Sequence, residues 1–351
     1  MSRYFQPHIA RMAGYAPGEQ PRGGEFIKLN TNENPYPPSP RVIEAIACAA
    51  GDRLRLYPDP LGTAFREVAA RRHGVDPSMI LAGNGSDDLL TIVTRAFVGP
   101  GDLVVAPTPS YILYKTLAEL QNARIVLVPF EPDWTLKADR FAVKDAKLAF
   151  LANPNSPSGT SLRPESVSEL AKKLECPLIV DEAYVDFADW DCVGLVRDHP
   201  NVIVTRSLSK GSGLAGLRFG YLIAASEIVS GLIKVKDSYN CDSLSLAGAA
   251  AALLDVEYAA GVRAKVLKTR ARLTDAMRGL GYRVPDSRAN FVWCLGGPPA
   301  ASVYDALKSR GILVRLMRYE GYDDGLRITV GTDQEIDRLL EELDKIIKQF
   351  R

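Results

Sequence analysis

The sequence predicts an α/β protein with a mostly parallel central sheet and helices on both of its faces. Short, continuous apolar runs, typical of strands buried on both faces, recur through the middle of the chain. Helical patterns separate most of these runs, and such alternation is typical of a doubly covered parallel sheet. After about residue 245 the order of elements changes, which indicates a smaller α+β domain.

Each element is expected from its local pattern. In the large part, strands are expected at 103–106, 124–128, 148–152, 178–180, 202–204 and 219–224, and helices at 40–50, 62–72, 89–97, 111–121, 164–174 and 228–235. In the last part, helices are expected at 245–254, 258–281 and 333–349, and strands at 291–295, 312–314 and 326–330. The Gly- and Pro-rich start of the chain predicts an irregular arm with one short strand at 26–29.

These patterns give a domain division. A chain of 351 residues exceeds what one hydrophobic core usually sustains. We therefore expect an N-terminal arm over 1–38, a large cofactor-binding domain over 39–244 and a small domain over 245–351, against which the arm packs.

Composition excludes several classes of protein. The net charge of +1 gives no electrostatic reason to expect nucleic acid or an anionic membrane as a partner. Five dispersed cysteines without a C-x-x-C pair are typical of a reducing compartment, and no apolar run is long enough to span a membrane. With only three histidines, none at metal-ligand spacing, no metal site is expected. The prediction is a cytoplasmic protein.

The segment 207–221 carries the strongest chemical signal, because it places Lys210 among serines and glycines just after a buried strand. A lysine amine becomes a nucleophile for a carbonyl when it is desolvated and close to other cations. Pyridoxal phosphate supplies such a carbonyl, and its phosphate would bind hydroxyls, backbone N–H groups and Arg218. The same segment matches G-x-G-x-x-G at 211–216, but an apolar strand pattern follows where a dinucleotide site needs a helix.

Polar residues follow several of the expected strands. Ser86, Asn155, Asp181 and Lys210 each come just after an apolar run, and ligands of parallel sheets bind beyond the carboxyl ends of the strands. Asp181 alone could be a capping residue; with Lys210 it can keep a pyridine nitrogen protonated. The Gly85-Ser86-Asp87 turn is an anion cradle, an N-cap, or both. The proline-fixed segment with Asn32 is equally well a linker or a rigid wall facing a ligand.

Three segments, at 181–184, 207–210 and 214–218, together resemble the fold-type-I pyridoxal-phosphate-dependent aminotransferases, and the likeness extends from Tyr15 to Gly331. The resemblance implies that Lys210 binds the cofactor covalently, that Asp181 pairs with the ring nitrogen and that Tyr184 binds the ring hydroxyl. It places Tyr111 against the ring. Around the phosphate it places Ser207, Ser209, Arg218, the Gly85-Ser86-Asp87 loop and, from the partner of a homodimer, Tyr57.

The resemblance also implies substrate-binding residues: Arg327 with Arg315 for substrate anions, and Tyr15 as a closing arm tyrosine. Asn32, from the proline-fixed segment, is a further candidate for substrate binding. One position departs from the family pattern, because Ser156 stands where an asparagine usually contacts the ring hydroxyl. Either Ser156 contacts the ring hydroxyl with its shorter side chain, or Asn155 takes the place of the usual asparagine.

The implied activity is transamination between a small-molecule amino donor, L-histidinol phosphate, and the 2-oxo acid 2-oxoglutarate. Within the fold, the alternatives are an aromatic amino-acid aminotransferase and a threonine-phosphate decarboxylase. A nucleotide-dependent oxidoreductase rests only on the glycine pattern, and a ligand-sensing regulator lacks a basic helix-turn-helix segment to support it.

Overall fold

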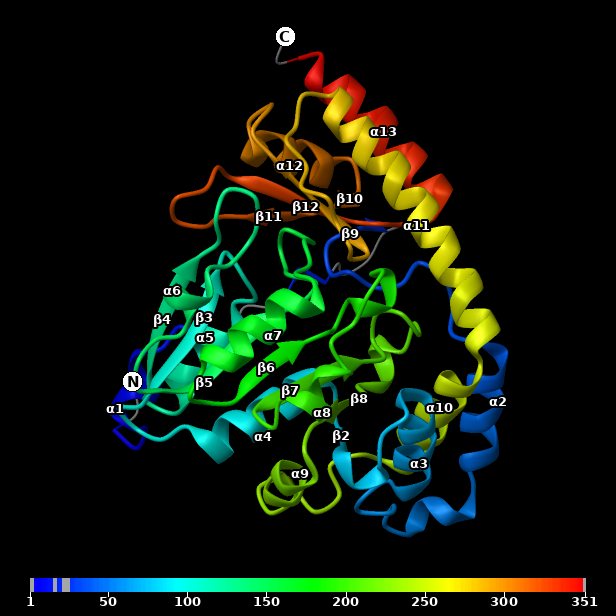
Figure 1. The fold of residues 1–351 in the computed structure, drawn as a ribbon. Coiled ribbons are helices and arrows are strands. Elements are labelled where there is room, and N and C mark those ends of the chain that lie inside the picture. Colours follow the sequence, from blue (N-terminus) through cyan, green and yellow to red (C-terminus); the bar gives the residue numbers. More distant parts are fainter. Residues whose placement is uncertain (1–2, 15–17, 21–25, 350–351) are drawn as a thin grey trace.

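The computed structural model describes residues 3–14, 18–20 and 26–349, and its centre is a seven-stranded sheet (Figure 1). The strands lie in the order β2-β8-β7-β6-β5-β3-β4. Only β8 runs antiparallel to its neighbours; the other adjacent pairs are parallel. The bounds are β2 Ile80–Gly83, β3 Leu103–Thr108, β4 Arg124–Pro129, β5 Ala146–Ala152, β6 Leu178–Asp181, β7 Val202–Ser207 and β8 Gly220–Ile223. The predicted fold class is confirmed.

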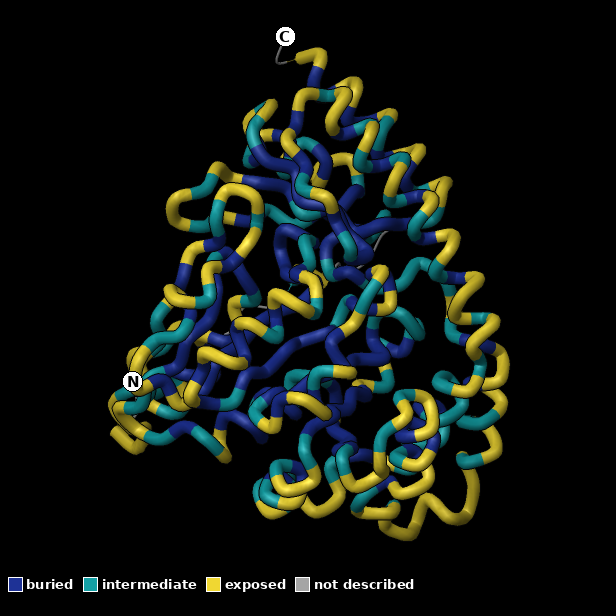
Figure 2. Tube along the Cα trace, in the orientation of Figure 1, coloured by how far each residue is buried: buried dark blue, intermediate teal, exposed yellow. Residues whose placement is uncertain are grey.

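Helices cover both faces of this sheet because its inner strands are apolar on both. Ile179 and Ile203 pack toward α4 (Ser86–Phe97), α5 (Leu113–Leu120) and α9 (Ser226–Ile233). Their neighbours Val180 and Val204 pack on the opposite face. That face is covered by α3 (Thr63–His73), α7 (Pro164–Lys173), α8 (Leu195–Asp198) and α10 (Ser243–Leu254). Figure 2 shows the buried chain running along these strands and the exposed chain on the outer helices.

A smaller, antiparallel sheet of order β11-β12-β9 lies beyond the large one (Figure 1). Its strands are β9 Phe291–Leu295, β11 Arg315–Met317 and β12 Gly325–Thr329, and one of its faces packs on α11 (Val256–Gly279), α12 (Ala300–Ser309) and α13 (Asp333–Ile347). Helix α13 begins with a capping box between Thr332 and Glu335. Of these elements, β11 and α12 were not expected from the sequence.

The strand of the N-terminal arm belongs to this second layer, whereas its first helix lies against the large domain. Strand β1 (Ile27–Lys28) pairs in parallel with β10 (Ile312–Leu313), and Leu29 is buried in the core that the helices of the small domain share. Outside this strand the arm carries the short helix α1 (Pro7–Arg11), which contacts α5.

Helix α10 lies with the large sheet, although the sequence placed residue 245 at the start of the small domain. It packs on α2 (Pro40–Ala49) and α3, and its Ala249 is part of the large core. Asp255 separates the two cores: α10 before it packs in the core of the large sheet, and α11 after it packs in the core of the small domain. Within the described ranges no single helix is long and apolar enough to cross a membrane, and the one consecutive pair that qualifies jointly, α10 with α11, is bent by 77°.

Candidate active site

A cavity of about 340 Å³ lies where the large sheet, the small sheet and the arm meet. Of the site residues predicted from the sequence, those lining it are Asn32, Ser86, Asp87, Tyr111, Ser156, Asp181, Tyr184, Ser207, Ser209, Lys210, Arg218, Arg315 and Arg327. These residues come from segments far apart in the sequence. The fold brings them together around one cavity, as the sequence motifs suggested.

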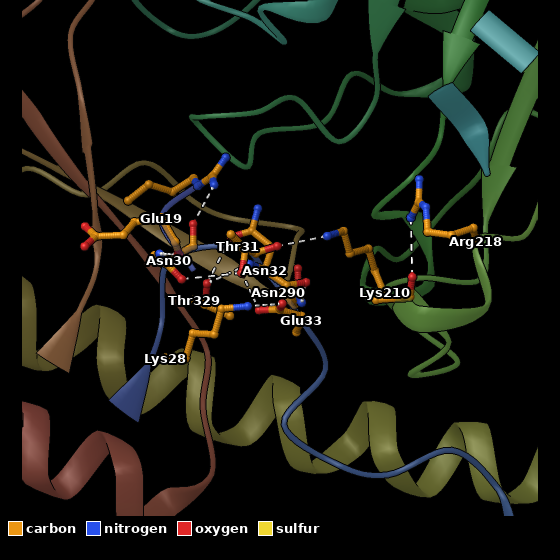
Figure 3. A network of polar contacts seen from close by, with 12 residues as sticks. Glu19, Lys28, Asn30, Thr31, Asn32, Glu33, Lys210, Arg218, Asn290 and Thr329 are labelled. Carbon is orange, nitrogen blue, oxygen red and sulfur yellow. Dashed lines mark hydrogen bonds and ion pairs between the residues drawn. The ribbon is translucent and has the colours of Figure 1, made fainter. Parts of the chain in front are cut away.

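Lys210 extends into this cavity from the turn that follows β7 (Figure 3). Its Nζ donates a hydrogen bond to the carbonyl of Thr31 at 3.0 Å. Asn34 fixes the turn by donating to the carbonyls of Lys210 and Gly211, at 2.9 and 3.0 Å. Burial lowers the pKa of Lys210 from 10.5 to about 8, and the positive charge of Arg327 adds to the shift. A neutral amine is therefore accessible near neutral pH.

Asp181 ends β6 with its carboxylate on the sheet face that α5 covers. Its oxygens accept from the Tyr114 hydroxyl at 2.9 Å and from the Thr205 hydroxyl at 3.2 Å. Burial raises the pKa of Asp181 to about 6, while the hydrogen bond from Tyr114 acts in the opposite direction. A cation beside this carboxylate would offset its desolvation and keep it ionised.

Tyr114 was missed in the sequence analysis. It is fully buried, and its ring stacks on Phe150 with centroids 4.6 Å apart. The available signal was its spacing: Tyr114 lies three residues after Tyr111 in the helix predicted at 111–121, and residues three apart share a helix face. The sequence singled out only the first of the two. The observed helix α5 begins only at Leu113.

The hydroxyl of Tyr184 accepts a hydrogen bond from the Asn32 amide at 3.1 Å. Asn32 has φ 57, in the left-handed region that asparagine tolerates, and its carbonyl side-chain oxygen accepts from Thr329 on β12 at 3.1 Å. The segment around Asn32 is therefore a wall of the cavity (Figure 3). The linker alternative is not what the structure shows.

One corner of the cavity is suited to an anion. Helix α4 starts there without a side-chain cap, so its first backbone N–H groups are available to a ligand, and Ser86 lines the cavity. Gly220 on β8 allows the start of α4 to lie close to the strand, because a Cβ at that position would lie 2.7 Å from the backbone nitrogen of Ser86. Arg218 completes the corner, with its Nη1 3.4 Å from the Ser209 hydroxyl.

Arg218 has φ 52, a left-handed conformation that costs a non-glycine residue about 1–3 kcal/mol. Gly85 packs so closely that a Cβ there would lie 2.8 Å from the guanidinium. The Asp87 carboxylate lies 3.7 Å from Arg218 and accepts from the Tyr111 hydroxyl at 3.2 Å. An incoming phosphate would share Arg218 with Asp87.

Two arginines line the side formed by the small sheet. Arg315 and Arg327 are direct cross-strand partners on β11 and β12. Arg327 donates to the Ser156 hydroxyl and to the Asn30 carbonyl, both at 3.1 Å. Paired guanidiniums suit phosphate and carboxylate ligands equally. Ser156, in the family's asparagine position, thus contacts the arginine.

Some predicted residues lie elsewhere. Asn155 is buried but does not line the cavity, because its amide donates to Pro109 and Ser158 and its oxygen accepts from Ser110; it does not replace the missing asparagine. Tyr57 is 81% exposed and stacks on Tyr239. Tyr15 lies outside the described residues.

The glycine pattern at 211–216 does not open a helix. A short 3-10 turn (Ala215–Leu217) overlaps its last two residues, and β8 begins soon after. This is not the context of a dinucleotide site. Among the residues that the structure describes, no group of three or more His, Cys, Asp or Glu side chains is placed to hold a metal ion.

The residues present fit pyridoxal phosphate. The cavity offers an amine whose protonation is suppressed, a buried carboxylate that a ring cation would stabilise, and an anion-binding corner. A parallel sheet that presents such a lysine and carboxylate at one edge defines the class of enzymes that bind an aldehyde cofactor through lysine.

The chain belongs to the aminotransferase class I and II family, whose model matches residues 24–343. The histidinol-phosphate aminotransferase of Rhodopirellula baltica is 48% identical over 349 residues, covering 99% of this chain and 96% of the relative. Histidinol-phosphate aminotransferase 1 of Trichormus variabilis is 44% identical over 352 residues, covering 99% and 100%.

Solved structures agree. The crystal structure of histidinol-phosphate aminotransferase from Sinorhizobium meliloti in complex with pyridoxal-5'-phosphate has a TM-score of 0.91 and 28% identity, covering 100% of this chain and 99% of that one. Aspartate aminotransferase from Thermus thermophilus with maleate, at 18% identity and a TM-score of 0.81 over 92% of each chain, shares the fold.

Proposed function

We propose that this aminotransferase uses pyridoxal phosphate to transfer the amino group of L-histidinol phosphate to 2-oxoglutarate, giving imidazole acetol phosphate and L-glutamate in histidine biosynthesis. The observation that carries the proposal is the arginine pair, Arg315 and Arg327, facing the cavity that holds Lys210. The near full-length likeness to histidinol-phosphate aminotransferases supports this choice of donor.

The cofactor would be held at three points. Lys210 would bind its aldehyde, Asp181 its ring nitrogen, and the corner at the start of α4 with Arg218 its phosphate. Tyr184 would donate to the ring hydroxyl while Asn32 donates to Tyr184. Bound there, pyridoxal phosphate supplies a ring that withdraws electrons from the substrate carbon next to the amine.

Lys210 is the residue that moves the proton. With the donor bound, the Nζ of Lys210 would be free to remove and return a proton at the substrate carbon that carries the amine. A pKa near 8 suits removal and return of a proton near neutral pH. The Thr31 carbonyl, at 3.0 Å, gives the amine a fixed direction within the cavity.

The arginine pair serves both half-reactions, because a guanidinium fork binds phosphate and carboxylate alike. Arg327 would hold the phosphate of L-histidinol phosphate in one half and a carboxylate of glutamate in the other. Its bonds to Ser156 and Asn30 fix its plane before either ligand arrives.

We further infer a cytoplasmic homodimer. All five cysteines are free thiols, as in a reducing compartment. Tyr57 stacks on Tyr239 at the surface beside the exposed Leu54 and Leu56, an arrangement suited to reaching a partner's cofactor phosphate. Light scattering after size exclusion, on the wild type and on Tyr57→Ala, tests the assembly.

Donor profiling tests the proposed reaction. The holoenzyme is assayed with 2-oxoglutarate and L-histidinol phosphate, L-phenylalanine or L-tyrosine, with glutamate formation as the readout. We expect the highest kcat/KM for L-histidinol phosphate. A preference for the aromatic amino acids would overturn the donor assignment, and release of carbon dioxide without an acceptor would indicate a decarboxylase.

A further inference from the structure

The small sheet has two different faces. Val292, Leu326 and Leu316 face the helices α11–α13 and belong to or pack on that core. The alternate residues of β11, Arg315 and Met317, face the cavity instead. Side chains alternate along a strand, so this edge presents a cation and then an apolar group about 7 Å apart.

Tyr319 continues this row two residues beyond Met317 and also lines the cavity. Its hydroxyl donates to the carbonyl of Ser110 on the large domain, at 3.1 Å. Ser110 directly precedes Tyr111, the residue expected against the cofactor ring. The Tyr319 side chain therefore reaches across from the small domain to the cofactor side of the cavity.

An aromatic cluster supports Tyr319 from behind. Trp293 is fully buried, and its ring centroid lies 6.1 Å from that of Tyr319 in an edge-to-face arrangement. Tyr322, from the same hairpin, stacks on Trp134 of the large domain with centroids 6.0 Å apart. Gly325 makes room for the indole, because a Cβ there would clash with Trp293 Nε1. The cluster fixes the hairpin that carries Tyr319.

The two amino donors of the proposed reaction differ in the group that would contact Met317 and Tyr319. Both carry an anion for the arginine pair, but only L-histidinol phosphate carries a flat aromatic ring. Met317 and Tyr319 offer an apolar, aromatic surface next to the arginines, and such a surface favours an aromatic ring over the short polar chain of glutamate.

We propose that Tyr319, with Met317, is a specificity-determining residue that forms the wall for the donor's aromatic ring, and that Trp293, Tyr322 and Trp134 position it. This inference rests on the proposed function and deepens it by assigning the ring subsite.

The test compares Tyr319→Leu with Tyr319→Phe in the holoenzyme, using L-histidinol phosphate as amino donor with 2-oxoglutarate as acceptor, and L-glutamate as amino donor with the ketone imidazole acetol phosphate as acceptor. For Tyr319→Leu we expect kcat/KM to fall about tenfold with L-histidinol phosphate and to stay within about twofold with L-glutamate. Tyr319→Phe keeps the ring and should preserve the ratio of the two values. Tyr304→Leu, on α12 and away from the cavity, is the matched control and should leave both values unchanged.

An equal loss with both donors would overturn the proposal, since it would make Tyr319 a structural latch to Ser110. An unchanged ratio of the two kcat/KM values in Tyr319→Leu would overturn the proposal too. So would a fall of this ratio in Tyr319→Phe as large as the fall in Tyr319→Leu. If the wild type prefers L-phenylalanine to L-histidinol phosphate, the proposed donor fails separately, and the ratio of L-phenylalanine to L-glutamate then tests the same wall.

Discussion

The two sides of the cavity are built differently. On the large-domain side, Asp181 is 4% exposed and accepts hydrogen bonds from neighbours on a rigid sheet and helix. On the small-domain side, Arg315 and Arg327 are only partly buried and project from short strands. We therefore expect the first side to hold a reacting group in one geometry and the second side to accept more than one ligand.

This difference separates the residues expected to carry out the reaction from the residues expected to select the amino donor. A change on the large-domain side should lower the rate with every donor by the same factor. A change on the small-domain side should act mainly through KM or through the ratio between donors. The following experiments test this division, beginning with the largest expected effect.

Replacement of Lys210 by alanine should lower kcat at least ~1,000-fold with both donors, because covalent binding and proton transfer are lost together. The visible absorption band of the lysine-bound cofactor should disappear as well. Lys172→Ala, at an exposed position on α7, is the control and should retain the band and the activity. Retained turnover in the Lys210 variant would refute the assigned role.

The pH dependence of cofactor capture should follow the lowered pKa of Lys210. Only the neutral amine attacks an aldehyde, so the rate of capture should rise with pH and level off above about 8. Between pH 6 and pH 8 the rise should be about 50-fold. Stopped-flow absorbance of apoenzyme mixed with pyridoxal phosphate, in amine-free buffers, measures it. A rate still climbing beyond pH 10 would indicate an ordinary, solvated lysine.

Exchange of Arg327 for lysine keeps the charge but removes the fork. We expect KM to rise ~10- to 100-fold for both L-histidinol phosphate and L-glutamate, because one or more charge-assisted hydrogen bonds are lost. The value of kcat should change much less. Steady-state kinetics in both directions measure this, and a fall in kcat with unchanged KM would assign Arg327 to the chemical step.

Tyr114→Phe removes a donor from Asp181 without opening a cavity. We expect kcat to fall ~10-fold with both donors and KM to remain unchanged, because a hydrogen bond to a buried charge is lost. Phe150→Leu changes the same packing without touching Asp181, so it separates loss of the hydrogen bond from loss of stacking. A donor-dependent effect of Tyr114→Phe would contradict the division between the two sides.

Ser156→Ala should have the smallest effect. It removes one acceptor from Arg327, whose other hydrogen bond, to the Asn30 carbonyl, remains. We expect kcat/KM to fall ~2- to 10-fold for both donors, mainly through KM. Ser156→Asn restores the side chain usual in the family and measures what the departure costs. A large fall in kcat would instead place Ser156 at the cofactor ring.

Much of the large sheet was predictable from the sequence because a doubly buried strand is apolar throughout. For example, β6 ends at Asp181, and β7 ends at Ser207, three residues before Lys210. Strand β11 was not predictable, because its residues, Arg315-Leu316-Met317, neither form an apolar run nor carry a turn signal. Short edge strands depend on their partners more than on their own residues.

The site was predictable where motif and chemistry coincide. Lys210 and Asp181 stand out locally, because Asp181 is a charged residue at the end of an apolar run and Lys210 follows the next such run among serines and glycines. Tyr319 and Tyr114 do not, because their roles depend on a carbonyl and a carboxylate that are distant in the sequence. Asn155, predicted at the cofactor, lies outside the cavity lining, because its amide bonds to its own loop and to the neighbouring one.

The stretch from Ile27 to Asn34 limits how this enzyme can be engineered. It pairs with β10, accepts a hydrogen bond from Arg327 through Asn30, and holds the lysine turn through Thr31 and Asn34. A chimera that takes its large domain from one relative and its small domain from another would therefore have to match this stretch to both parents. The β11–β12 hairpin is subject to the same limit, because Arg327 and Thr329 bond to Asn30 and Asn32 of the arm and Tyr319 bonds to Ser110 of the large domain.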